Sequence, residues 1–214
     1  DFLSQQGLSF FEMTVGMAFW YFAKAQVDIA VIEVGMGGRL DSTNIITPEV
    51  SVITNIGYDH MQFLGDTLPK IAGEKAGIIK PTVPVVIGEK QEEVQSVFEE
   101  KAKQCNAPLI YASDSEESYQ SDLLGSHQRE KAKTAVAAIR QLDGFTISQE
   151  HITQGLAKVV QNTNLKGRWQ ILENTPFTVC DTAHNKEGLS IVMQQLQDQD
   201  YEQLHIVLGM VNDK

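Results

Sequence analysis

The chain has 214 residues, of which 42% are hydrophobic and 21% are charged, which excludes a disordered chain. Its 17 basic and 28 acidic residues give a net charge of −11, and no basic cluster is dense enough for an electrostatic nucleic-acid surface. The longest apolar run, residues 15–23, is too short to span a bilayer, and the two cysteines lack metal-ligand spacing, which indicates a reducing compartment. We therefore expect a cytoplasmic protein that binds neither nucleic acid nor membrane.

The two ends of the chain predict that it is an internal piece of a longer enzyme. It opens at Asp1 without a methionine or a signal peptide, and it stops at Lys214 just after a strand-like run at residues 205–209. A parallel α/β sheet rarely ends on a strand and a charged turn, because the helix that should follow is then missing.

The first half of the chain alternates predicted helices with predicted strands. Residues 10–24 are apolar nearly all round and rich in aromatics, which predicts a helix buried on several faces. Residues 89–104 predict a charged, exposed helix. Strands are predicted at residues 28–34, 50–56, 83–87 and 108–111.

A further helix in this half carries clear boundary signals. It is predicted over residues 67–76, with Asp66 or Thr67 as its N-cap. Pro69 suits the first turn, and Gly77 suits the end of the helix.

The second half continues the alternation of helices and strands. The predicted elements are helices at residues 130–142, 148–160 and 186–197, and strands at residues 170–172, 177–180 and 205–209. The polar run 161–167 is the best candidate for a domain boundary. We expect an α/β fold with a mainly parallel sheet flanked by helices over residues 1–163, followed by the start of a Rossmann-like α/β domain over residues 164–214.

Residues 33–44 place polar groups at the end of a predicted strand, where open α/β sheets bind ligands. Glu33 ends an apolar strand, where an unpaired acid is costly, and Arg39 and Asp41 follow a run of glycines. The segment lacks the Gly-Lys-Ser/Thr of a phosphate-binding P-loop, and a plain tight turn is the alternative interpretation.

Two further segments carry candidate metal ligands. Asp59 and His60 follow the next predicted strand, so Glu33 and His60 could share a divalent cation, although a lone histidine is more often structural. Lys75 shares a predicted helix face with Ile71 and Ile78. Such a lysine either extends along apolar surface to reach water or has a function.

These three segments, in this order, resemble the folylpolyglutamate synthase and dihydrofolate synthase family, which is related to the Mur ligases. The matching motifs are residues 33–44, Asp59-His60 with residues 64–67, and residues 74–78. Later motifs match in the same order: Gly125-Ser126-His127-Gln128, Gly167-Arg168, Asp181-Thr182-Ala183-His184-Asn185 and residues 209–214. The resemblance covers nearly the whole chain.

The resemblance implies an ATP-dependent ligase in which a folate or dihydropteroate carboxylate attacks the γ-phosphate of ATP. Glutamate then displaces phosphate from the acyl phosphate, as in folate biosynthesis and polyglutamylation. It implies that Glu33, His60 and Lys75 are catalytic residues that hold Mg²⁺, with Lys75 as a carbamate. It also implies that Arg168, Asp181 and His184 contact the nucleotide, and that the parent enzyme is a monomer.

The sequence departs from the family pattern at two positions and lacks one motif. Lys131 stands where the family usually has asparagine, and Thr182 stands where glycine is usual. No Gly-x-x-x-x-Gly-Lys-Ser/Thr motif occurs, and in the family this P-loop lies upstream of the matching segment. We therefore expect the 214-residue chain by itself to have negligible ligase activity and weak affinity for ATP.

Three other functions are open at this point. A Mur-type peptidoglycan ligase is possible, although the Gly-Gly-Arg-x-Asp pattern favours folate. A metal-dependent hydrolase could use a cluster of Glu, His and carbamylated Lys, but the chain has no His-x-His and five histidines in all. A non-catalytic module on the same fold is the third. The sequence does not distinguish dihydrofolate synthase from folylpolyglutamate synthase activity.

Overall fold

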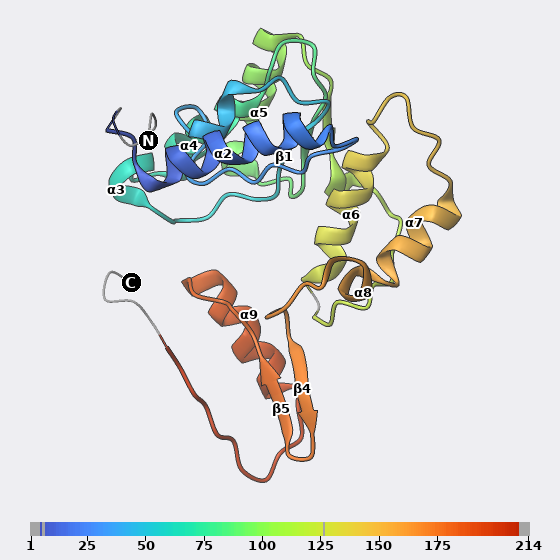
Figure 1. Ribbon diagram of the computed structural model, residues 1–214. Helices are drawn as coiled ribbons and strands as arrows, with labels where there is room; N and C mark the ends of the chain where they lie inside the picture. The colour runs from blue at the N-terminus through green and yellow to red at the C-terminus, as the bar shows by residue number, and fades with distance from the viewer. Residues whose placement is uncertain (1–4, 6, 126, 210–214) are drawn as a thin grey trace. The chain divides into compact units, whose positions relative to one another are not determined.

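A computed structural model of the 214-residue chain describes residues 5, 7–125 and 127–209. The chain divides into two compact units, Asp1–Val85 with Gln91–Leu109 and Val86–Lys90 with Ile110–Lys214. Helices and strands alternate along it (Figure 1), which confirms the predicted α/β class. No helix within the described ranges is long and apolar enough to cross a membrane.

A three-stranded parallel sheet forms in the order β1-β2-β3. Its strands are β1 (Ser51–Ile53), β2 (Val85–Ile87) and β3 (Leu109–Tyr111). The central strand β2 is the most buried, since none of its residues is more than 1% exposed. Burial of each such aliphatic side chain stabilises the fold by roughly 1.5–3 kcal/mol. The strands predicted at residues 50–56, 83–87 and 108–111 are confirmed, with shorter limits.

Two helices of the first unit, α4 (Leu68–Lys75) and α5 (Glu92–Cys105), contact each other (Figure 1). Thr67 caps α4, because its side-chain oxygen accepts a hydrogen bond from the backbone N–H of Lys70. The helices bury a shared set of apolar residues: Ile71, Ala72, Val94, Phe98 and Ala102. Both predicted helices are confirmed in position, but α5 buries one face and is not the exposed helix that its charge predicts. The short elements η1 (Ser42–Ile45), α3 (Met61–Leu64) and η2 (Ala76–Ile78) connect the strands and helices.

The aromatic helix α2 (Phe10–Ala25) forms where the sequence predicts it, but its predicted burial on several faces is wrong for the described chain. Val15 is its one buried residue, while Phe10 is 82% exposed and Trp20 is 64% exposed. The ring of Phe11 packs against Gly35, and Phe19 and Phe22 are partly buried, whereas Phe10, Trp20 and Tyr21 are exposed. Composition predicts that a helix can be buried, whereas burial also needs a neighbour.

Two predicted strands are absent from the described structure. Residues 28–34 and 205–209 have no ladder partner among the described residues, and Val31 and Val207 are 94% and 101% exposed. Strands are stabilised by pairing, so a β-branched run without a neighbouring strand stays irregular. Most of the motif at residues 209–214 lies outside the described residues.

The second unit has a helical part made of η3 (Ala112–Asp114), α6 (Gln128–Ile139), α7 (Gln149–Leu156) and α8 (Val159–Thr163). The single helix predicted over residues 148–160 is therefore two helices. The reason is Asp122, whose carboxylate accepts the backbone N–H groups of Val159 and Val160 at 3.0 and 2.9 Å. A carboxylate at this place favours the start of a new helix.

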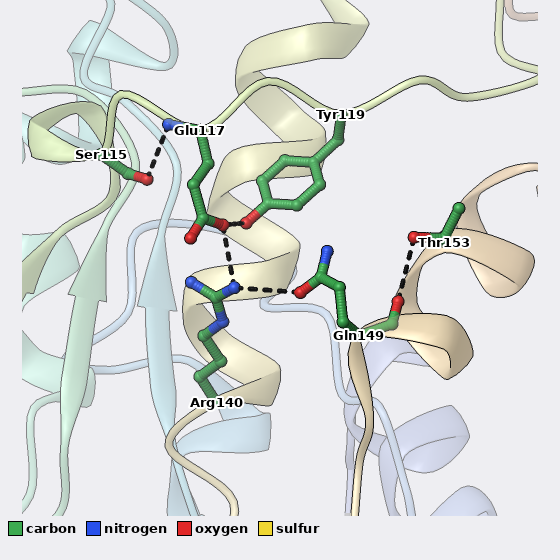
Figure 2. A network of polar contacts seen from close by, with 6 residues as sticks. All are labelled: Ser115, Glu117, Tyr119, Arg140, Gln149 and Thr153. Carbon is green, nitrogen blue, oxygen red and sulfur yellow. Dashed lines mark hydrogen bonds and ion pairs between the residues drawn. The ribbon is translucent and has the colours of Figure 1, made fainter.

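A polar network joins the segment before α6 to α6 and α7 (Figure 2). The carboxylate of Glu117 accepts hydrogen bonds from Arg140, at 2.8 Å, and from the hydroxyl of Tyr119. Arg140 also donates to the side chain of Gln149 at 3.3 Å. The bond from Arg140, followed by that from Tyr119, holds the pKa of Glu117 below its usual value. Beside this network, Tyr119 packs with Ala132, Val136, Ile152 and Leu156.

The remainder of the second unit is a hairpin followed by a helix. Strands β4 (Gln170–Asn174) and β5 (Phe177–Cys180) pair antiparallel, with an irregularity between Ile171 and Glu173 (Figure 1). Helix α9 (Lys186–Gln197) begins where Asn185 accepts a hydrogen bond from the N–H of Gly188 at 2.8 Å. Both strands and the helix are confirmed close to their predicted limits.

Candidate active site

The glycine-rich segment after Glu33 is held in shape by Asp41. The carboxylate of Asp41 accepts the backbone N–H of Met36 at 2.8 Å and that of Thr43 at 2.9 Å. Burial by itself raises the pKa of Asp41, but the hydrogen bonds from Thr43 and Met36 outweigh it and bring the pKa below its usual value. The Asp41 carboxylate therefore stabilises the loop by accepting hydrogen bonds from the backbone of the loop itself.

Two of the three glycines of this loop bring three segments together. Gly37 has a φ of +66°, and a Cβ there would lie 2.7 Å from the side chain of Leu64, at the end of α3. A Cβ on Gly38 would lie 2.9 Å from the carbonyl oxygen of Glu74 and 3.0 Å from that of Lys75. Only glycine permits so close an approach of backbone to backbone. The loop after Glu33 thus packs on both segments that carry the other two candidate metal ligands.

The packing of the loop on α4 and η2 leads to a prediction about two glycines of those elements, Gly73 and Gly77. A Cβ on Gly77 would lie 2.3 Å from Cα of Arg39, whereas a Cβ on Gly73, within α4, would meet nothing within 4 Å. Gly77→Ala should lower the thermal midpoint of the full-length protein, since such overpacking costs about 1–3 kcal/mol. Gly73→Ala is the matched control and should leave the midpoint unchanged or raise it. Equal effects of the two variants would show that the loop does not pack here.

The three predicted metal ligands differ in their surroundings. Glu33 is exposed in the unpaired segment, and Lys75 is half-buried in the last turn of α4. His60 takes the left-handed conformation, with φ 49°, at the N-cap of α3, and its Nε2 lies 3.8 Å from a carboxylate oxygen of Asp59. The structure brings together the loop after Glu33 and the segments that carry His60 and Lys75. A metal shared by the three side chains stays a prediction.

The types of donor atom test whether a divalent cation fits this set. Within the described part of the chain, no three His, Cys, Asp or Glu side chains are grouped so that they could hold a metal ion. The predicted set of metal ligands therefore depends on Lys75 as well as on Glu33 and His60. An amine suits Mg²⁺ poorly, because this ion prefers oxygen ligands, whereas a carbamate on Lys75 would offer two oxygens. The carbamylated set fits a divalent cation chemically.

The three predicted nucleotide-binding residues lie in the second unit, around one turn. The carboxylate of Asp181 accepts the backbone N–H of Trp169 at 2.7 Å and that of Ala183 at 2.8 Å. Arg168 donates to the carbonyl of its neighbour Gly167 at 3.1 Å and to the hydroxyl of Thr182. Nδ1 of His184 lies 3.0 Å from the carbonyl oxygen of Thr182. These residues hold residues 167–169 against residues 181–183, and contact with a nucleotide stays a prediction.

Two buried polar atoms near this turn were not anticipated as a pair. Nδ1 of His127 and Oε1 of Gln195 are buried without a hydrogen-bond partner among the described residues. Both lie close to Gly125, where a Cβ would be 3.2 Å from each atom. Burial, followed by the charge of Lys131, lowers the pKa of His127. The motif around His127 drew attention to that residue, but no pattern in the sequence singles out Gln195 on α9.

The model of the Mur ligase middle domain matches residues 11–148, more than half of the chain. The chain belongs to the Mur ligase family. This membership is consistent with its parallel sheet and with its motifs.

Individual relatives define the similarity further. The chain is 33% identical over 232 residues to the dihydrofolate synthase/folylpolyglutamate synthase of Bacillus subtilis, covering 95% of this chain and 53% of that protein. Among solved structures it is similar to Escherichia coli FolC in complex with DHPP and ADP (TM-score 0.79, 30% identity, 92% of this chain and 49% of that one). It is also similar to Mycobacterium tuberculosis folylpolyglutamate synthase complexed with ADP (TM-score 0.80, 32% identity, 92% and 50%). The chain thus spans about half the length of these Mur ligase relatives.

Proposed function

We propose that the protein of this chain is an ATP-dependent ligase that joins glutamate to the carboxylate of a folate or a dihydropteroate. The observation that carries the proposal is the packing of the glycine-rich loop on α3 and α4, because it gathers the segments of all three candidate metal ligands. The similarity to dihydrofolate and folylpolyglutamate synthases, one of them solved with DHPP and ADP, supports the choice of substrates.

The chemistry that these residues serve is the joining of two anions. The substrate carboxylate attacks the γ-phosphorus of ATP, the bond to ADP breaks, and an acyl phosphate forms. The amine of glutamate then attacks the acyl carbon, phosphate leaves, and the amine gives up a proton. A bound Mg²⁺ would neutralise charge on the transferred phosphate. Glu33, His60 and carbamylated Lys75 are proposed to hold that ion.

The second unit is proposed to contribute nucleotide contacts. Asp181 accepts one hydrogen bond from the backbone N–H of Trp169, on the turn at residues 167–169, and one from that of Ala183 in its own segment. Arg168, on that turn, is exposed and permanently charged, so it can meet a phosphate without a large desolvation cost. His184 lies on the facing segment and completes the proposed contacts.

A direct assay tests the proposal. The full-length protein is incubated with MgATP, radiolabelled glutamate and either dihydropteroate or a reduced folate, and labelled product, ADP and phosphate are measured. We expect product, ADP and phosphate in equal amounts, and no product when ATP or the pterin is omitted. Formation of AMP and pyrophosphate, or of no labelled product with either substrate, would contradict the proposal.

The same assay separates the alternatives. A Mur-type peptidoglycan ligase would use a muramoyl carboxylate and not a pterin. A metal-dependent hydrolase would release product from a glutamylated substrate without ATP. A non-catalytic module would do neither.

A further inference from the structure

The pair Arg39 and Glu74 is joined through both side chains and backbone. Nη2 of Arg39 lies 2.9 Å from Oε1 of Glu74, and Nε lies 3.2 Å from both carboxylate oxygens. In addition, the backbone N–H of Arg39 donates to the carbonyl oxygen of Glu74 at 2.8 Å. A guanidinium that uses two nitrogens on one carboxylate fixes the orientation as well as the distance of its partner. The two residues are 35 positions apart in the chain.

A second connection extends the attachment toward η2. The side-chain amide of Asn44 donates to the carbonyl oxygens of Arg39 and Gly77 at 3.2 and 3.1 Å. The ammonium of Lys80 donates to the carbonyl oxygen of Asn44 at 2.9 Å. The loop is therefore fastened to the end of α4 and to the residues that follow it.

The position of this attachment suggests what it does. Glu74 directly precedes Lys75, and the backbone at Lys75 is one of the close neighbours of Gly38. The side chains of Arg39 and Glu74 are 56% and 25% exposed, and ion pairs with this degree of exposure contribute little to stability. The pair is thus better suited to fixing geometry than to holding the fold together.

We propose that Arg39 and Glu74 are positioning residues that hold the end of α4, and with it Lys75, in register with the loop after Glu33. The inference rests on the proposed function for its consequence in catalysis, because it assigns neither residue a contact with reacting atoms. Misplacement of a catalytic group by about 1 Å can lower a rate by roughly 100-fold. Loss of the pair should therefore affect turnover and metal use more than folate binding.

Four variants of the full-length protein test the pair. Arg39→Ala and Glu74→Gln remove one partner each, and Arg39→Lys keeps the charge but loses the two-nitrogen geometry. The double variant Arg39→Glu/Glu74→Arg reverses the pair. Lys70→Gln is the matched control, since Lys70 lies on the same helix as Glu74 and its Nζ forms an exposed ion pair with Oδ1 of Asp66, before the helix, at 2.8 Å.

Ligation kinetics give the first readout. We expect Arg39→Ala and Glu74→Gln to lower kcat by about tenfold or more and to raise the Mg²⁺ concentration that gives half-maximal rate, with KM for the pterin changed less than threefold. The kcat of Arg39→Lys should lie between the values of these two variants and that of the wild type. The reversed pair should recover part of the lost kcat. The proposal would be overturned if kcat and the half-maximal Mg²⁺ concentration of every variant stayed within twofold of those of the Lys70→Gln control. It would also be overturned by a reversed pair with no recovery.

Hydrogen exchange gives a readout that does not depend on activity. The backbone N–H of Arg39 donates to the carbonyl oxygen of Glu74, which Glu74→Gln keeps. If the side-chain pair holds the loop on α4, its loss should loosen this bond, so exchange of the Arg39 N–H should accelerate at least tenfold in Glu74→Gln and stay unchanged in Lys70→Gln. Unchanged exchange in Glu74→Gln would overturn the positioning role, even if activity were lost. If the wild type shows no ligation, the proposed function fails, and the exchange result still decides whether the pair holds the loop.

Discussion

Lys75→Ala should abolish most of the proposed ligase activity of the full-length protein. The substitution removes the proposed carbamate, which supplies two oxygens and one negative charge to the metal site. Stabilisation of phosphate charge by a metal ion contributes several kcal/mol, so the loss should be on the order of 10²–10⁴-fold in kcat. Lys70→Ala changes an exposed lysine on the same helix and should keep nearly full activity.

The proposed carbamylation of Lys75 allows a second test of this prediction, by chemical rescue. Carbamylation adds carbon dioxide to the neutral amine and releases a proton, which leaves a carboxylate-like group at the end of the side chain. Formate or acetate at high concentration can occupy the space left in Lys75→Ala and should restore part of the rate. A surface lysine without function predicts full activity in Lys75→Ala. A loss of activity that no carboxylate reverses, in a protein that also unfolds earlier than the wild type, would point to a structural role.

Glu33→Gln and His60→Ala should each lower kcat much more than they raise KM for the pterin. Both residues are proposed to hold the ion that acts on charge developing at the transferred phosphate, and the pterin carries no part of that charge. We expect a loss of roughly 10²-fold or more in kcat for each variant. Glu49→Gln and His205→Ala are the controls, since both side chains are exposed and neither belongs to the proposed set of metal ligands. Normal kcat with a strongly raised KM would place Glu33 and His60 in the pterin site.

Local signals predicted the regular elements well. Helix α4 (Leu68–Lys75) is capped by Thr67 and followed by Gly77, and α9 (Lys186–Gln197) has its predicted limits. The starts of both helices are set within a few residues of chain by side-chain caps, whereas Gly77, predicted to end α4, lies inside the following turn η2. Residues 28–34 show the limit of such reasoning, because a strand also needs a partner that its own sequence does not supply.

The candidate site was predicted in part. The motifs pointed to the segments of Glu33, His60 and Lys75, but the contacts that join those segments are long-range. The bonds between Arg39 and Glu74, and the approach of Gly38 to the same backbone, link positions about 35 residues apart and follow no period. Likewise, the motif that contains Asp181 does not predict that its carboxylate accepts hydrogen bonds from two backbone N–H groups.

A crystal structure of the full-length protein with Mg²⁺ and a non-hydrolysable ATP analogue tests the metal site most directly. We predict a metal ion bound by Glu33, His60 and a carbamate on Lys75, with metal–oxygen distances of about 2.0–2.1 Å and the nucleotide phosphates beside it. An unmodified Lys75 that points into solvent, together with an ion bound away from Glu33 and His60, would contradict the account.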